Sequence, residues 1–101
     1  MGLAQIQYHP ATFVQSEETH RAAYNAAFFQ LGLHWHWDTV TYHELLRKPA
    51  EKDRICAYVK EHHPHLLTAY DIVFLSHLVY ETKQRCHENL SMLSSVASVR
   101  S

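Results

Sequence analysis

The chain has 101 residues, a formal net charge of −1 with its ten histidines counted as neutral, and a hydrophobic fraction of 47%. This length and composition predict one globular domain and exclude a largely disordered chain. The near-neutral charge argues against a nucleic-acid partner, which would require a basic surface along the phosphate backbone. Only two glycines and three prolines are present, which favours helices with short connections over a β-rich fold.

The N-terminal part is predicted to be an extended strap followed by the first helix. Residues 1–15 have no helical periodicity, whereas Glu17–Leu31 carries an apolar stripe with helical spacing. Ser16 is a suitable N-cap for this helix. Gly32 stands where a C-terminal glycine in the left-handed conformation belongs, with Leu33 placed for the accompanying apolar contact.

Two shorter helices are predicted in the middle of the chain. The second helix should begin at Asp38 or Thr41, since both residue types cap helix N-termini, and it should end before Pro49. Pro49 also suits the first position of a third helix, because a proline there loses no hydrogen bond. Pro64 closes this third helix.

The C-terminal part is predicted to hold the longest helix. The segment "PHLLTAY" resembles a short helix or helical turn, and Asp71 then caps a helix from Ile72 to about Leu90 or Leu93. Its apolar seam contains Ile72, Leu75, Val79, Cys86, Leu90 and Leu93, joined by Phe74 and Leu78. Residues 94–101 should fray. We therefore expect one all-α domain over residues 1–101, a compact bundle of four helices with an extended N-terminal strap, and a fifth helix if the short segment is helical.

The protein is predicted to be cytoplasmic, and three negative observations lead to this prediction. No apolar run approaches the roughly 20 residues that cross a membrane. No basic and then apolar leader opens the chain. The cysteines Cys56 and Cys86 form no CxxC motif, and although they could form a disulfide, two free thiols in a cytoplasmic protein are the commoner case.

The run "HWHWD" connects the first two predicted helices. Side chains alternate between faces in an extended segment, so Trp35 and Trp37 should point one way and His34 and His36 the other. The favoured interpretation is structural. The two indoles pack on the bundle, the imidazoles face water, and Asp38 caps the next helix.

A metal site is the alternative interpretation of the same run. His34 and His36 lie on one side of the segment and could share a zinc or copper ion if another ligand joined them. The candidates for that ligand are Asp38, if it does not cap the next helix, and the cluster His62, His63 and His65, of which the first and last have HxxH spacing. No other cofactor is predicted, and no catalytic motif for nucleophilic or phosphate chemistry is present.

The aromatic and histidine content points to binding rather than catalysis. Tyrosine and tryptophan are enriched at protein interfaces, and this chain holds six and two of them. We therefore expect a protein-interaction module that binds another protein or itself, with Trp35, Trp37 and Tyr42 as the candidate interaction surface. A metal-binding protein or small metalloenzyme using the histidines is the second hypothesis.

Overall fold

The structure, a computed structural model, describes the backbone of residues 10–100 and the side chains of residues 17–92. In this part of the chain it contains α1 (Pro10–Gln30), α2 (Thr39–Leu45), α3 (Glu51–His62), the 3-10 helix η1 (Pro64–Thr68) and α4 (Ile72–Arg100), and no strand. The predicted all-α bundle is confirmed, and η1 is its short fifth helix. Among the described residues, no helix is both long and apolar enough to cross a membrane.

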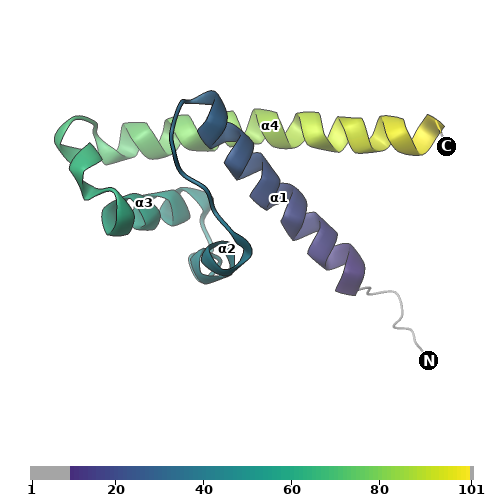
Figure 1. Ribbon diagram of the computed structural model, residues 1–101, viewed down its shortest axis with the longest axis horizontal. Coiled ribbons are helices and arrows are strands. Elements are labelled where there is room, and N and C mark those ends of the chain that lie inside the picture. The colour runs from purple at the N-terminus through teal and green to yellow at the C-terminus, as the bar shows by residue number, and fades with distance from the viewer. Residues whose placement is uncertain (1–9, 101) are drawn as a thin grey trace.

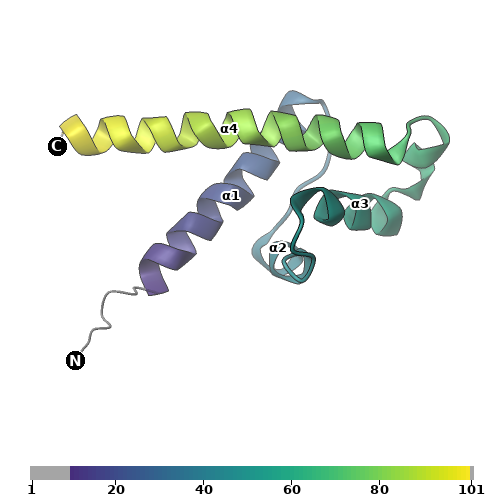
Figure 2. The same cartoon turned by 180° about the vertical axis from the view of Figure 1, so that it is seen from behind.

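The long helix α4 is the axis on which the other elements are arranged (Figures 1 and 2). The C-terminal part of α1 crosses α4 near its middle, and α3 lies alongside the N-terminal half of α4. The short helix α2 packs against α3 on the side away from α4. The end of α4 extends past the other helices, which gives the molecule its elongated dimensions of 55 × 31 × 19 Å.

The end of α1 follows the predicted glycine motif. Gly32 has a φ of 73°, which an L-amino acid with a side chain rarely adopts. The Leu33 N–H donates to the Phe28 carbonyl at 2.8 Å, and the Gly32 N–H donates to the Phe29 carbonyl at 3.1 Å. These two bonds form a Schellman ending. Because the chain reverses there, the segment that contains both tryptophans is directed back along α1.

Two aspartates begin the second and fourth α-helices. Asp38 Oδ1 accepts from the Thr41 N–H at 2.8 Å at the start of α2, so Asp38 rather than Thr41 is the N-cap. Asp71 Oδ2 accepts in the same way from the Phe74 N–H at 3.0 Å. Both caps satisfy backbone donors that have no partner inside the helix.

The structure differs from the prediction where local signals are weak. Helix α1 begins at Pro10 rather than at Glu17, because proline is well tolerated in the first turn and nothing in 11–16 breaks a helix. The predicted strap would then be limited to residues 1–9, which lie outside the described residues. Helix α4 continues to Arg100, past the predicted end, since 94–100 contains neither glycine nor proline. Helix α3 begins at Glu51, two residues after Pro49.

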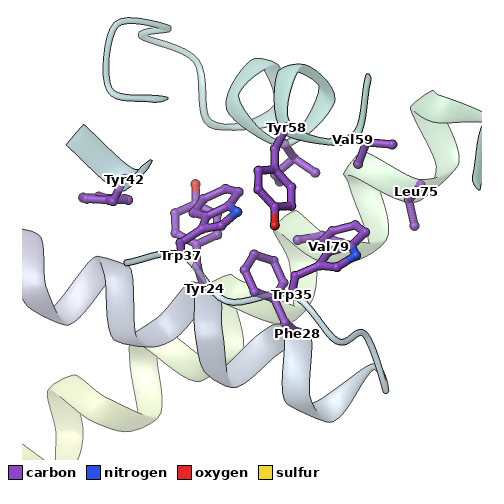
Figure 3. Close-up of a cluster of buried hydrophobic side chains, with 10 residues drawn as sticks. Tyr24, Phe28, Trp35, Trp37, Tyr42, Tyr58, Val59, Leu75 and Val79 are labelled. Carbon is purple, nitrogen blue, oxygen red and sulfur yellow. The ribbon is translucent and has the colours of Figure 1, made fainter. Parts of the chain in front are cut away.

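The core is built largely from aromatic rings (Figure 3). Rings from α1, α2, α3 and the connecting segment meet above the apolar face of α4. The buried members are Tyr24, Phe28, Trp35, Trp37, Tyr42, Ile55, Tyr58, Val59, Leu75 and Val79. A second, smaller cluster of Ala23, Ala27 and Cys86 lies between α1 and α4, where the small side chains allow the two helices to pack closely.

Candidate functional site

The "HWHWD" segment is an anchored connection, as the structural interpretation predicted. Trp35 and Trp37 are buried, whereas His34 and His36 are exposed. The indole of Trp37 lies 4.5 Å from the ring of Tyr24, and that of Trp35 lies 5.2 Å from Phe28, between ring centroids. The segment thus contributes both of its large side chains to the core.

The backbone of Trp37 is held by polar side chains of α1. Asn25 donates from Nδ2 to the Trp37 carbonyl at 3.1 Å and accepts from the Trp37 N–H at 2.8 Å. Arg21 donates from Nη1 to the same carbonyl at 2.9 Å and also forms an ion pair with Glu18 at 2.7 Å. The Asn25 amide thereby pairs with both the N–H and the carbonyl of Trp37, as the backbone of a neighbouring β-strand would. Sequence analysis did not identify this contact, and an asparagine inside a helix was its only signal.

Replacing Asn25 with alanine is expected to lower the free energy of unfolding by about 1–3 kcal/mol, because the partly buried Trp37 N–H loses its only partner among the described residues. Urea denaturation followed by circular dichroism measures the change. Gln30→Ala, at an exposed position of the same helix, is the control and should stay within about 0.5 kcal/mol of the parent. Equal stability of the two variants would show that the Asn25 contact contributes little.

The predicted metal ligands are not gathered around one point. Among residues 17–92, no group of three or more histidine, cysteine, aspartate or glutamate side chains is placed to hold a metal ion. His63 stacks on Trp35 with ring centroids 5.1 Å apart, and His65 lies beside it at 5.8 Å. His62 packs instead on Tyr58, at 4.8 Å. Burial, assisted by the neighbouring His65 and His62, lowers the pKa of His63.

The three aromatic residues predicted as an interaction surface are core residues. Trp35, Trp37 and Tyr42 are buried in the aromatic cluster, because the connection and α2 fold their apolar faces onto α1 and α3. A partner cannot reach these rings in this conformation. Surfaces elsewhere on the molecule must therefore carry any interaction.

A buried polar cluster lies where α1, α3 and α4 meet. Lys83 of α4 is fully buried, and its Nζ donates to Glu51 Oε1 at 2.6 Å and to His20 Nδ1 at 3.0 Å. Gln84 Oε1 is a third and longer acceptor at 3.4 Å. The Tyr24 hydroxyl donates to the same Glu51 oxygen at 2.6 Å. All three ammonium protons thus have an acceptor, and Lys83 has no free proton to offer a ligand.

The ionisation of this cluster follows from its contacts. Burial raises the pKa of Glu51, but hydrogen bonds from Lys83 and Tyr24 outweigh it, so the carboxyl has a net lowered pKa. Burial and the hydrogen bond to Glu51 raise the pKa of Tyr24 far above its usual value. Glu51 is therefore the carboxylate and Lys83 the ammonium of a buried ion pair, which a neutral tyrosine supports.

A small polar cavity of about 240 Å³ opens beside this cluster. Side chains of both charges line it, and it is bounded by Glu17, His20, Tyr42, Leu46, Pro49, Glu51 and Arg54. The Tyr42 hydroxyl donates to Glu17 at 2.8 Å, and the Arg54 guanidinium donates to the carbonyls of Lys48 and Pro49. Most polar groups around the cavity are thus bonded to other parts of the protein.

An apolar groove of about 260 Å³ lies at the opposite end of α1. The end of α1, the start of the connection, η1 and the first turns of α4 form its walls. Its lining residues are Leu31, Gly32, Leu33, Leu66, Tyr70, Phe74, Leu75 and Leu78. The sequence placed both Leu75 and Phe74 on the apolar side of the last helix. Leu75 is buried as predicted, whereas Phe74 is 56% exposed.

Comparison with known proteins gives a partial similarity. No family model and no solved structure matches the chain. Protein CbbY of Cereibacter sphaeroides is 41% identical over 49 residues, which are 48% of this chain and 21% of that protein. The plasmid-borne Protein CbbY of Cupriavidus necator is 43% identical over 47 residues, 46% of this chain and 18% of that protein. About half of the chain is thus similar to roughly a fifth of each relative.

Proposed function

We propose that this chain is a protein-interaction module that binds an apolar helical segment of another polypeptide in the groove between the end of α1 and the start of α4. The observation that carries the proposal is the exposure of large apolar side chains at this groove. Phe74 and Tyr70 line it and are 56% and 50% exposed, and Val73 beside them is 69% exposed. Exposed apolar surface of this kind is typical of docking sites.

A second contribution comes from the end of α1. Phe29 is 85% exposed, the largest value among the bulky apolar side chains that the structure describes. Its carbonyl accepts from the N–H of Gly32, which lines the groove. Phe29 therefore belongs to the same end of the molecule as the groove. The groove itself is lined by Leu31 and Leu33 on the α1 side and by Phe74 on α4. Apolar side chains on both sides of a groove are the arrangement that receives the apolar face of a helix.

We also assign the chain to the cytoplasm, because Cys56 and Cys86 are both unpaired and disulfides are rare there.

The test uses a fluorescent amphipathic peptide with leucines at helical spacing, and a peptide of the same composition in scrambled order. The first peptide should bind the parent protein, and Phe74→Ser should weaken that binding about tenfold or more, since a large apolar contact is lost. Val40→Ser is the matched control, because Val40 is also exposed but lies on α2. Its affinity should equal that of the parent.

Two outcomes would overturn this proposal. Equal binding of the ordered and scrambled peptides, or equal weakening by Phe74→Ser and Val40→Ser, would mean that the groove does not recognise a helix. Sedimentation of the protein alone over a range of concentrations completes the test. A dimer that Phe74→Ser abolishes would replace the foreign polypeptide with a second copy of this chain.

A further inference from the structure

We propose that His20 is a proton-controlled contact between α1 and α4: in its neutral form it accepts a hydrogen bond from the buried ammonium of Lys83, and its protonation loosens α1 from α4. His20 belongs to the buried polar cluster, which is separate from the proposed binding groove.

The contacts of His20 require a neutral ring. Lys83 Nζ lies 3.0 Å from His20 Nδ1, and an ammonium group can only donate, so Nδ1 carries no proton and the proton of the ring is on Nε2. One face of the His20 ring is also in contact with α4. The ring of His87, on α4, stacks on that of His20 with centroids 4.2 Å apart and planes inclined by 10°.

A proton on Nδ1 would remove this hydrogen bond and place two cations in its place. Lys83 is fully buried and His20 is half-buried, so water screens the repulsion between the ammonium and a charged imidazole only weakly. His87, which lies on α4 like Lys83, also faces His20 and adds a second basic group. Within residues 17–92, His20 contacts α4 through the stack on His87 and the hydrogen bond from Lys83, and protonation abolishes the second of these contacts.

The carboxylates around His20 oppose this effect but are already engaged. Glu51 of α3 accepts from both Lys83 and Tyr24, and Glu17 of α1 accepts from Tyr42. The balance favours the neutral ring. Burial is the largest cause that lowers the pKa of His20, Lys83 and His87 lower it further, and Glu51 and Glu17 raise it by less.

The direction of the pH dependence follows from linkage. The pKa of His20 is lower in the folded chain than the value of about 6.5 in an unfolded chain. The unfolded state therefore binds more protons in mildly acidic solution. The contact contributes its full stability above about pH 6.5, and this contribution is lost as the pH falls toward the folded-state pKa.

The experiment compares urea unfolding at about pH 7.5 and about pH 5.5, where carboxylates still remain ionised. His20→Gln is the test variant, because its amide oxygen can accept from Lys83 but does not titrate. His77→Gln is the matched control, since His77 lies exposed on α4 beside Lys52 and Glu81. The parent and His77→Gln should share the same loss of stability at the lower pH, and that loss should be clearly smaller in His20→Gln.

The size of the expected difference is set by one proton. The unfolding equilibrium constant can rise up to about tenfold for each pH unit below the unfolded pKa through His20 alone. If His20→Gln keeps the full pH dependence of the parent, the proposal is wrong. Nitrogen NMR of the histidine rings in the parent is independent of any variant, and His20 titrating at or above about pH 6.5 would overturn the proposal as well.

Discussion

Replacing Trp37 with alanine is expected to lower the free energy of unfolding by about 3–5 kcal/mol, the range for removal of a buried aromatic side chain. The indole is fully buried and lies against four rings. Its centroid is 4.5 Å from Tyr24, 5.0 Å from Phe28, 5.4 Å from Tyr58 and 6.4 Å from Tyr42. Alanine would leave a cavity between α1, α2 and α3 that no single side chain can fill.

The variant Trp37→Phe separates packing from polarity. Trp37 Nε1 is buried and has no hydrogen-bond partner among the described residues, so phenylalanine removes an unsatisfied donor as well as part of the ring. We expect Trp37→Phe to cost clearly less than Trp37→Ala. Phe29→Ala, at an exposed position, should change stability by no more than about 0.5 kcal/mol.

Urea denaturation followed by far-ultraviolet circular dichroism measures all three variants, because tryptophan fluorescence would change with the substitution itself. A Trp37→Ala protein within about 1 kcal/mol of the parent would contradict the prediction. It would mean that the connection can move and close the cavity. The backbone bonds from Asn25 and Arg21 to Trp37 oppose such a movement.

The features that sequence analysis predicted correctly depend on short-range signals. Gly32 ends α1 because one residue must adopt a positive φ, and Asp71 begins α4 because its side chain caps the helix. The alternation of Trp35 and Trp37 with the exposed histidines is also local, since it follows from extended backbone. Signals of this kind need no knowledge of the remaining chain.

The buried polar cluster could not be predicted in the same way. Glu51, His20 and Lys83 are far apart in sequence, and their contact depends on how three helices pack. One signal was present, because Lys83 lies four residues after Val79 and three before Cys86, on the apolar seam of the last helix. A lysine at such a position indicates a buried charge with a partner, but it does not identify the partner.

The exposed groove shows a further limit of periodicity. Phe74 and Leu75 are neighbours, and a helical pattern permits either of them to face the core. The structure buries Leu75 and leaves Phe74 exposed, because the position of α3 and η1 decides which side of α4 is covered. The exposed apolar surface around Phe74 therefore could not be predicted from the sequence pattern, because it depends on how the helices pack.

Replacing Glu51 with alanine is the second substitution with a large expected effect, and it should cost about 3 kcal/mol or more. It leaves the Lys83 ammonium buried without its carboxylate, which is among the most destabilising changes that a protein interior can undergo. Glu61→Ala is the control on the same helix, because the Glu61 side chain is 76% exposed. Its stability should stay within about 0.5 kcal/mol of the parent.

The opposite substitution, Lys83→Met, should cost less than Glu51→Ala, and this asymmetry follows from exposure. The side chain of Glu51 is 28% exposed and that of Lys83 only 1%, so a Glu51 carboxylate without its partner can regain water, whereas the ammonium cannot. The double variant Glu51→Leu with Lys83→Met should recover much of the stability lost in Glu51→Ala, since an apolar pair of similar volume carries no desolvated charge. Chemical denaturation of the parent, the two single variants and the double variant measures these differences. If Lys83→Met proves the more damaging single change, the carboxylate rather than the ammonium is the group that the fold cannot leave unpaired.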